Sequence, residues 1–318
     1  MSLHRFILKR LLSIIPILFG VSVITFGLVY LTPGDPVDQM VALNPHVSPS
    51  DEATLRAQYG LDRPAWEQYL LWMSNVLTGD FGQVYSSGRD VSSVVLQRLP
   101  ETIVLGLFGW IFALVIAIPA GIYAAVNKDQ LGDTVSRFLA LSGISIPNFW
   151  LGLMLILIFS LILGLFPVLP PSREPLYHPR MLWYLLLPGV TIGTAAAASI
   201  MRVMRTSMAE ELNKEYVTAA RAKGLPERQI VLKHVLRNSL ISVVTLAATL
   251  TASIVAGSVV VEVVFNWPGL GREFIMAING REMNLIMAIT LFTGFFVIIA
   301  NLIADILYAV LDPRIRYE

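Results

Sequence analysis

The side chains that could act in catalysis or hold a metal are scattered along this sequence and form no motif. The four histidines, His4, His46, His178 and His234, are far apart, and there is no cysteine. Neither the His-Glu-x-x-His pattern of zinc peptidases nor the Gly-x-Ser-x-Gly turn of serine hydrolases occurs. No Gly-Lys dipeptide occurs, so the phosphate-binding loop is absent as well. The sequence therefore predicts no catalytic residue, no metal site and no nucleotide site in this chain.

Isolated charged residues near apolar runs are the next candidates, because a charge in hydrocarbon costs on the order of a few kcal/mol. Asp305 lies near the end of the last apolar run, where it either pairs with an arginine such as Arg314 or takes part in gating. Glu262 lies just before Phe265–Gly269, a segment that contains Trp267. Its proline and glycine are typical of a solvated turn. These residues are candidates for a gate or pathway, with a structural alternative for each.

The composition indicates a protein that crosses a membrane several times. Of 318 residues, 55% are hydrophobic and 14% charged, with a mean hydropathy of +0.68, whereas roughly a quarter of the residues in soluble domains are charged. A helix needs roughly 20 apolar residues to cross the bilayer. Six runs are long enough and predict an all-α integral membrane protein with six transmembrane helices: 11–31, 103–126, 138–166, 182–201, 239–261 and 285–304.

The third run is long enough to tilt or bend. Pro147 lies inside it, in Ser145-Ile146-Pro147-Asn148, and removes a backbone hydrogen-bond donor. The sequence therefore predicts a kink at Pro147, which is either a packing feature or part of the transport pathway.

The distribution of basic residues predicts the orientation. Lysine and arginine are enriched in cytoplasmic loops. Six spans place both termini on one side, and assigning that side to the cytoplasm puts 15 of the 23 basic residues there, including all five lysines. The large first loop on the opposite side carries nine acidic residues. Both termini are therefore expected in the cytoplasm.

The first apolar run follows basic residues, as in a secretory signal peptide, but its length of about 21 residues exceeds the usual 7–15 of a signal core. It is expected to remain as the first span. Residues 1–101 then comprise this span and an extracytoplasmic loop region. Residues 102–318 form a five-helix core that includes a cytoplasmic segment at about 207–238.

A short amphipathic helix is predicted in the first loop, where Trp66, Tyr69, Leu70 and Met73 recur at helical spacing. One interpretation is a helix on the outer membrane interface, with Trp66 and Trp72 as aromatic anchors. The other is a contact with a substrate-delivery protein.

The charged segment Glu215–Arg237 lies between two long apolar runs and has the form of a docking element. Leu212, Tyr216 and Ala219/Ala220 recur at helical spacing and predict one apolar face with small residues that a partner could approach closely. Glu215, Arg221 and Lys223 lie off that stripe. Gly224 is a helix stop and Pro226 a first-turn start, so two short helices should meet at a bend. We refer to Glu215–Pro226 as the elbow. The basic residues around it are diluted by interleaved glutamates, which argues against a nucleic-acid surface.

The elbow resembles the cytoplasmic EAA loop of ATP-binding-cassette (ABC) importer permeases. That pattern is Glu-Ala-Ala, three residues, Gly, nine residues and Ile-x-Leu-Pro, and Ala219, Ala220, Gly224 and Leu236 agree with it. Thr218, His234 and Arg237 depart from the Glu, Ile and Pro. The chain is more similar to the first permease subunit of dipeptide, oligopeptide and nickel importers, through Tyr216–Leu225 with His234–Asn238 and six further blocks: Leu31–Pro36, Tyr59–Pro64, Gly79–Gly82, Ser145–Gly152, Phe265–Gly271 and Leu311–Arg316.

The resemblance implies a type I importer permease in a prokaryotic inner membrane, which is not itself an enzyme. It implies a second homologous permease, two ABC ATPase subunits that use ATP and magnesium, and an extracytoplasmic solute-binding protein. It also implies that the elbow, with Glu215, Tyr216, Thr218, Ala219, Ala220, Arg221, Lys223, Gly224 and Pro226, couples to the ATPases. The Phe265–Gly269 segment would be a re-entrant outer loop that helps to close the pathway.

The competing hypothesis is a self-sufficient secondary transporter or channel. Secondary transporters usually have internal repeats and carboxylates in the middle of the membrane, and no repeat is evident here. The sequence does not distinguish among dipeptide, oligopeptide, nickel chelate, a glutathione-like peptide or opine as the solute.

Overall fold

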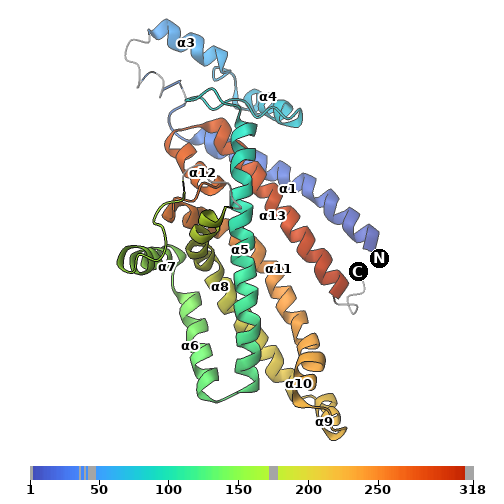
Figure 1. Cartoon of the computed structure of the whole chain (residues 1–318). Coiled ribbons are helices and arrows are strands. Elements are labelled where there is room, and N and C mark those ends of the chain that lie inside the picture. Colours follow the sequence, from blue (N-terminus) through green and yellow to red (C-terminus); the bar gives the residue numbers. More distant parts are fainter. Residues whose placement is uncertain (1–2, 36, 39–40, 42–47, 172–177, 312–318) are drawn as a thin grey trace. The chain divides into compact units, whose positions relative to one another are not determined.

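The computed structural model describes residues 3–35, 37–38, 41, 48–171 and 178–311. In this part of the chain the structure is mostly helical, with no strand and a single bridge between Gln83 and Asp90. Figure 1 shows the helices, which in chain order are α1 Leu3–Leu31, α3 Pro49–Gln58, α4 Ala65–Leu77, α5 Val91–Val126, α6 Leu131–Ser145, α7 Asn148–Leu155, α8 Pro179–Leu212, α9 Glu215–Ala222, α10 Glu227–Gln229, α11 Leu236–Val264, α12 Leu270–Asn279 and α13 Met283–Leu311. Two π-helical segments, η1 Ile156–Ile162 and η2 Ile230–Val235, follow α7 and α10.

Among the described residues, five helices are long and apolar enough to cross a membrane, and a sixth crossing results if α6 and α7–η1 count as one broken span. The five contain residues 10–31, 91–126, 179–212, 227–251 and 283–303. They overlap five of the six predicted apolar runs. The second of these helices, α5, begins at Val91, before the predicted apolar run that starts at residue 103. Its first part is more polar than the rest.

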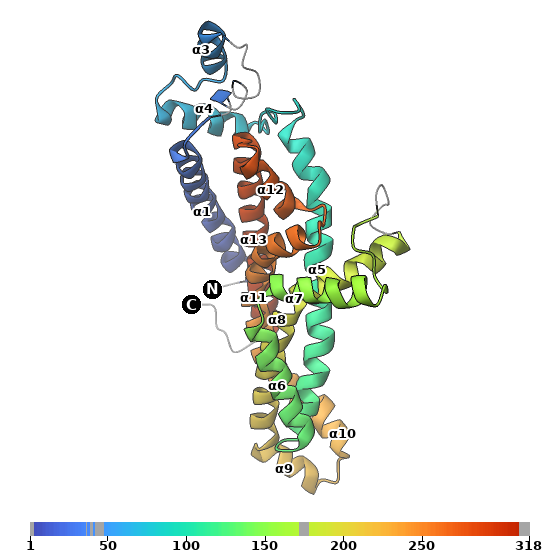
Figure 2. The same ribbon diagram turned by 90° about the vertical axis from the view of Figure 1, so that its left-hand side faces the viewer.

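The third predicted run is a broken helix and not one kinked span. α6 ends at Ser145, Ile146 is extended with φ −81° and ψ 122°, and α7 begins after Pro147. The two arms meet at 107°, and Figure 2 shows α7 turned across the direction of α6. A proline disfavours the helical conformation of the residue before it, which explains why the helix stops at this point. The predicted kink is therefore a complete break.

The chain divides into two compact units, which we describe separately. The first unit comprises residues 1–7, 101–267 and 299–318, and the second comprises residues 8–100 and 268–298. Residues 268–298, which the sequence division placed in the five-helix core, thus cluster with the first span and its loop.

The first unit is built around α8, which packs against α5, α6, α7 and α11. Within its most apolar window 72% of the residues are buried, against 28% or less in the other candidate spans. Glycines allow α5 to approach α8 very closely: a Cβ on Gly193 would lie 2.5 Å from the carbonyl oxygen of Gly109, and one on Gly121 would lie 2.6 Å from Cβ of Met204. Small residues at such crossings allow close helix packing in membranes. α8 is therefore the central helix of this unit.

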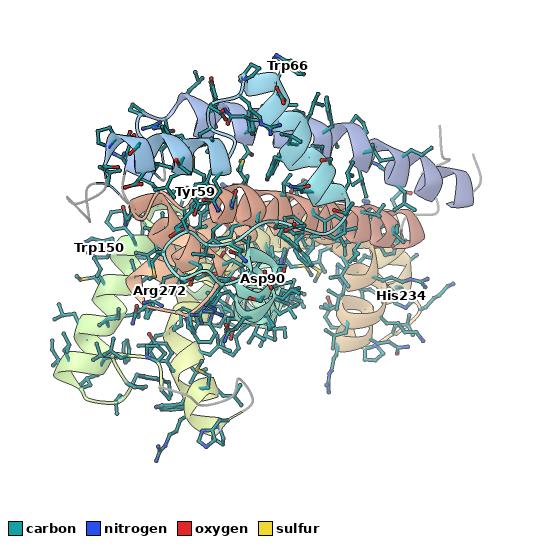
Figure 3. The ribbon with its side chains drawn as sticks, turned by 90° about the horizontal axis from the view of Figure 1, so that it is seen from above. Tyr59, Trp66, Asp90, Trp150, His234 and Arg272 are labelled. Carbon is teal, nitrogen blue, oxygen red and sulfur yellow. The ribbon has the colours of Figure 1, made fainter. Side chains whose placement is uncertain are left out.

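In the second unit, aromatic side chains join α4 to α1. Tyr69 lies 5.4 Å from Phe26 between ring centroids, and Trp72 lies 6.2 Å from the same ring. The Tyr69 hydroxyl is hydrogen-bonded to Ser22 at 2.9 Å. Trp66 is 65% exposed and, in Figure 3, points away from α12 and α13. Of the two tryptophans expected as interface anchors, only Trp66 is turned outward.

The segment after α4 is tied to the start of α13 by a buried carboxylate. Glu282 accepts hydrogen bonds from the backbone N–H groups of Tyr85 and Ser86, at 2.6 and 2.9 Å. Asn284 donates to the carbonyl oxygen of Gln83 at 3.1 Å. Valines 84, 91, 94 and 95 pack with Leu270, Ala277 and Leu285 into the core of this unit. These bonds fix a loop that has little regular structure of its own.

Candidate functional site

The elbow contains α9 and the predicted bend, and the second short helix, α10, begins directly after it at Glu227. α9 ends at Ala222, and Gly224 adopts φ +76°, a left-handed conformation that favours glycine. The N–H of Gly224 donates to the carbonyl of Arg221 at 2.9 Å, and the N–H of Leu225 donates to that of Ala220 at 3.3 Å. These two bonds form a Schellman cap. Pro226 is the N-cap of α10, one position before the expected first turn.

An ion pair closes the bend from the outside. The Arg221 guanidinium donates two hydrogen bonds to the Glu227 carboxylate, at 3.1 and 2.6 Å. This carboxylate raises the pKa of Arg221 above its usual range. Both side chains are exposed, so the pair contributes on the order of 1 kcal/mol or less. The cap, and not the ion pair, is the main constraint on the bend.

The structure corrects the predicted docking face. Leu212, Tyr216 and Ala220 are half-buried and pack against the core of their own unit, and the fully buried residue of α9 is Val217. The periodicity correctly predicts an apolar stripe on α9. It does not show whether this chain or another protein covers that stripe. The exposed side of α9 instead presents small and charged residues, namely Glu215, Thr218, Ala219 and Ala222, followed by exposed Lys223, Gly224 and Pro226.

A polar network holds α9 between the end of α8 and the start of α11. Glu211 accepts hydrogen bonds from the Tyr216 hydroxyl at 2.6 Å, from Asn238 at 3.4 Å and from Lys214. Asn238 also donates to the Tyr216 oxygen at 3.3 Å. Burial, together with the hydrogen bond to Glu211, raises the pKa of Tyr216, which remains a neutral donor at physiological pH. Tyr216 therefore positions the elbow.

A buried ion pair joins α6 to α8 two helical turns before α8 ends. The Asp133 side chain is fully buried and accepts hydrogen bonds from Arg205 at 2.5 and 2.7 Å. It also accepts the N–H of Asp129 at 3.0 Å, and Arg137 lies 3.4 Å away. Asp129 itself adopts φ +63°. One carboxylate thus holds the turn after α5, the start of α6 and the end region of α8.

A second cluster lies near the opposite end of α8. Tyr184 stacks on Trp267 with ring centroids 6.0 Å apart, and its hydroxyl donates to the carbonyl oxygen of Phe265. The Trp267 indole N–H donates to the carbonyl of Glu101 at 2.9 Å, and Thr102 donates to the buried Glu262 at 2.9 Å. The Tyr184, Phe265 and Trp267 rings and the Glu262 carboxylate are buried. The Phe265–Trp267 segment is therefore a packed structure and not a solvated turn.

Three of the four residues predicted to belong to a gate or pathway lie in or next to this cluster. Glu262 and Trp267 belong to the cluster, and Pro147 starts the α7 arm that packs on α11. A Cβ on Gly152 of α7 would lie 2.9 Å from the Phe265 ring, so this arm reaches the cluster. Asp305 lies in α13, and its side chain lies outside the described residues.

No group of three or more histidine, cysteine, aspartate or glutamate side chains in the described ranges could hold a metal ion. His234 lies in η2, and Figure 3 shows it far from Trp150, the other labelled residue of the first unit.

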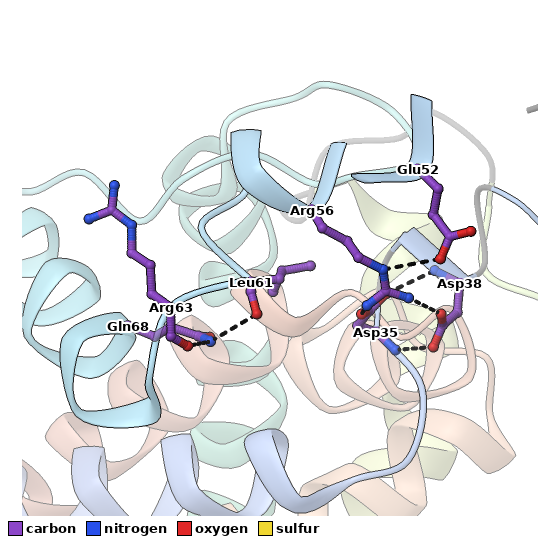
Figure 4. Close-up of polar contacts among 7 residues, drawn as sticks. All are labelled: Asp35, Asp38, Glu52, Arg56, Leu61, Arg63 and Gln68. Carbon is purple, nitrogen blue, oxygen red and sulfur yellow. Dashed lines mark hydrogen bonds and ion pairs between the residues drawn. The ribbon is translucent and has the colours of Figure 1, made fainter. Parts of the chain in front are cut away.

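The second unit contains a cavity of about 500 Å³ lined by residues of α1, α4, α13 and the loops between them. Three carboxylates lie on its wall, and each already holds the backbone. Asp35 and Asp38 accept each other's N–H at 2.9 Å and share Arg56, as Figure 4 shows. Asp80 accepts the N–H of Gly82 at 2.8 Å. These bonds give the carboxylates structural roles.

Comparison with known proteins identifies the family. The model of the binding-protein-dependent transport system inner membrane component matches residues 117–317, and the model of the N-terminal part of such a component matches residues 3–106. The chain belongs to this family of transport permeases.

Several curated permeases are similar over nearly their whole length. The oligopeptide transport system permease protein AppB of Bacillus subtilis is 40% identical over 316 residues, covering 98% of this chain and 99% of that protein. The dipeptide permease DppB of Escherichia coli K12 is 35% identical, and the glutathione permease GsiC of the same strain is 39% identical, each over 99% of both chains. A solved structure titled as inward-facing MetNI methionine ABC transporter matches with a TM-score of 0.57 and 20% identity, over 69% of this chain and 96% of that one, and it shares the fold.

The chain is therefore a transmembrane permease subunit of an ABC importer. Permeases of this family work with ATPase and substrate-binding subunits. The elbow is predictable from the sequence, whereas the residues that hold this permease together are not, namely Asp133, Tyr184, Arg205 and Val217. Asp133 and Arg205 stand out as isolated charges in a weakly charged chain. Their separation of 72 residues hides the pairing.

We expect solute uptake by Gly224 variants to depend on how readily the new residue adopts a positive φ. Gly224→Asn should retain most uptake, because asparagine visits the left-handed region more readily than other residues. Gly224→Pro should abolish uptake, because proline fixes φ near −65° and removes the N–H that caps α9. Uptake is compared with the amount of subunit in the membrane by immunoblot. Equal uptake by the two variants would contradict the role of the cap.

We expect Arg205→Ala to destabilise the permease by about 3 kcal/mol, because it removes the main partner of a buried carboxylate. The double variant Asp133→Ala/Arg205→Ala should be less destabilised than the sum of the single variants, with a coupling energy of about 1 kcal/mol or more. Thermal unfolding in detergent measures this cycle. Arg202→Ala, an exposed arginine on the same helix, is the matched control and should change little. Additive single effects would contradict the pairing.

Proposed function

We propose that this permease imports peptides or a closely related small solute, using energy from separate ATPase subunits. The support is the near full-length similarity to permeases named for oligopeptide, dipeptide and glutathione transport. The matched region covers 98% or more of both chains, so it includes the positions of the spans, the loops and the elbow. The chain itself is a transport subunit and not an ATPase, and ATP and magnesium are bound by its partners.

The proposed topology has six spans in a prokaryotic inner membrane, with α6 and α7–η1 as one broken span. Both termini and the elbow lie in the cytoplasm, and the residues between α1 and α5 lie outside. The support is the excess of lysine and arginine on the side of the elbow. The elbow follows α8, and Tyr184 lies near the other end of that helix, about 40 Å away at 1.5 Å per residue. The elbow and the Trp267 cluster are therefore assigned to opposite membrane surfaces.

The proposed ATPase contact is the exposed side of α9, made by Glu215, Thr218, Ala219 and Ala222. Ala219 and Ala222 have small side chains, which allow a partner surface to approach the helix backbone. Val217 and Tyr216 hold the opposite side of α9 on the permease core. Force on α9 would therefore pass into α8 and α11 and would not be lost in a flexible loop.

The proposed outer gate is the packed cluster of Tyr184, Glu262, Phe265 and Trp267, with the α7 arm that begins at Pro147. Its support is that three aromatic rings and the Glu262 carboxylate are buried at this end of α8. Asp305 remains a candidate at the inner end of the last span. A single permease provides half of the pathway wall, so a second homologous permease completes it, and an extracytoplasmic solute-binding protein delivers the solute.

We expect Ala219→Glu to abolish ATP-driven uptake of a labelled dipeptide or oligopeptide, with a decrease of about tenfold or more. An unpaired charge forced into a close contact costs at least about 1.4 kcal/mol, which corresponds to that factor. The ATPase subunits should no longer co-purify. Ala219→Ser keeps the side chain small and is the matched control. Normal co-purification and uptake in Ala219→Glu would refute the docking assignment, and uptake driven by an ion gradient without ATPases would refute the importer assignment.

We expect single cysteines at Ser50 and Asn213 to report opposite sides of the membrane. Both positions are exposed, and the native chain has no cysteine to give a background. An impermeant thiol reagent should label position 50 in intact cells and position 213 only after the cells are opened. Labelling of position 213 in intact cells would overturn the orientation.

A further inference from the structure

Helix α4 carries two apolar stripes side by side. One consists of Ala65, Tyr69, Trp72 and Val76, and the other of Trp66, Leu70, Met73 and Leu77. Each stripe has the spacing i, i+4, i+7 and i+11, which keeps its members on one line along a helix. Most of the remaining positions are polar, including Glu67, Gln68, Ser74 and Asn75. The apolar surface of α4 is thus about twice as wide as a single contact with a neighbouring helix requires.

Only the first stripe is covered by the protein. Tyr69 contacts Phe19 and Phe26 of α1 and bonds to Ser22, and Trp72 packs on Phe26. Three of the four residues of the second stripe remain exposed, Trp66 at 65%, Leu70 at 56% and Leu77 at 79%, and Met73 is half-buried. Figure 3 shows Trp66 at the end of α4, directed away from α12 and α13.

Helix α4 is attached to a span whose surface belongs in the bilayer. α1 is long and apolar enough to span a membrane, and toward its end Ile24, Leu28 and Leu31 are 64%, 65% and 77% exposed. α4 is bound to this part of α1 through the aromatic contacts. A helix attached there, with an apolar side and a polar side, fits the boundary between hydrocarbon and headgroups, where tryptophan is enriched.

We propose that α4 is an in-plane membrane anchor whose stripe Trp66, Leu70, Met73 and Leu77 lies in the interfacial layer of the bilayer. The contact is apolar and not electrostatic. The only charged residue of α4 is Glu67, which is paired with Arg63 at 2.9 Å. Basic residues, which would attract anionic headgroups, are absent from this helix.

The anchor would also place the cavity of the second unit at the membrane surface. The side of α4 next to the first stripe supplies Gln68, Leu71, Trp72 and Asn75 to the cavity wall. The lipid contact and the cavity are thus on different sides of one rigid helix. The helix therefore fixes the position of the cavity relative to the lipid contact, and the loops do not change it.

The proposal is tested by spin labels in the assembled importer reconstituted into phosphatidylcholine vesicles. Single cysteines replace Trp66, Leu70 and Leu77 on the exposed stripe, and Ser74 and Thr78 serve as controls on the polar side of the same region. Labels on the stripe should be accessible to oxygen, which concentrates in lipid, and protected from a water-soluble nickel chelate. Labels at the controls should show the reverse. Adding phosphatidylglycerol should leave the pattern unchanged.

Each other result overturns the proposal. Access of the nickel chelate to the stripe means that it faces water. Protection from both reagents means that a protein covers it, either the second permease or, if protection requires its addition, the solute-binding protein. A pattern that depends on phosphatidylglycerol means that the contact is electrostatic. Comparing labels at three stripe positions guards against local distortion by any one substitution.

Discussion

The close approach of α8 to its neighbours is the constraint on which the first unit depends. Gly109 and Gly193 bring two helix backbones into contact, and Gly143 brings α6 within 3.0 Å of Ala198 as measured from an added Cβ. In a bilayer there is no hydrophobic driving force between helices, so such van der Waals contacts carry much of the association. A side chain larger than glycine would separate the helices along their length. The elbow and the Trp267 cluster would then lose their common support.

The buried polar groups of this permease hold chain segments together. Asp133 binds Arg205 and a backbone N–H, Glu282 binds two backbone N–H groups, and Tyr184 binds a backbone carbonyl. Each tethers an irregular segment to a helix, where an unsatisfied buried group would be costly. The same pattern is found around the elbow, where Tyr216 and Asn238 meet at Glu211. The ionisable residues of these three places thus join segments that are far apart in the sequence.

The fold class, the spans and the elbow were predictable because they depend on local sequence. Long apolar runs specify helices in a membrane, and Gly224 followed by Pro226 specifies a bend, since both act through backbone conformation. The break at Pro147 was predicted in place but not in extent. The surface that covers each helix face was not predictable. The stripe of Leu212, Tyr216 and Ala220 has the same sequence pattern whether it packs against another protein or against the core of this chain. The Asp133–Arg205 pair depends on two segments meeting in space, which one sequence does not reveal.

The π-helical segment η2 gives the junction between α10 and α11 an unusual geometry. Ile230 and Val235 are both fully buried although they are five residues apart. In an α-helix such residues point about 140° apart, because each residue turns the chain by about 100°. Hydrogen bonds from i to i+5 accommodate the extra residue and bring both side chains to the core. Deleting one residue here would therefore convert η2 to regular helix and keep both side chains on the core side, because residues four apart in an α-helix point only about 40° apart. The loss of one amino acid would leave the direction of this junction nearly unchanged.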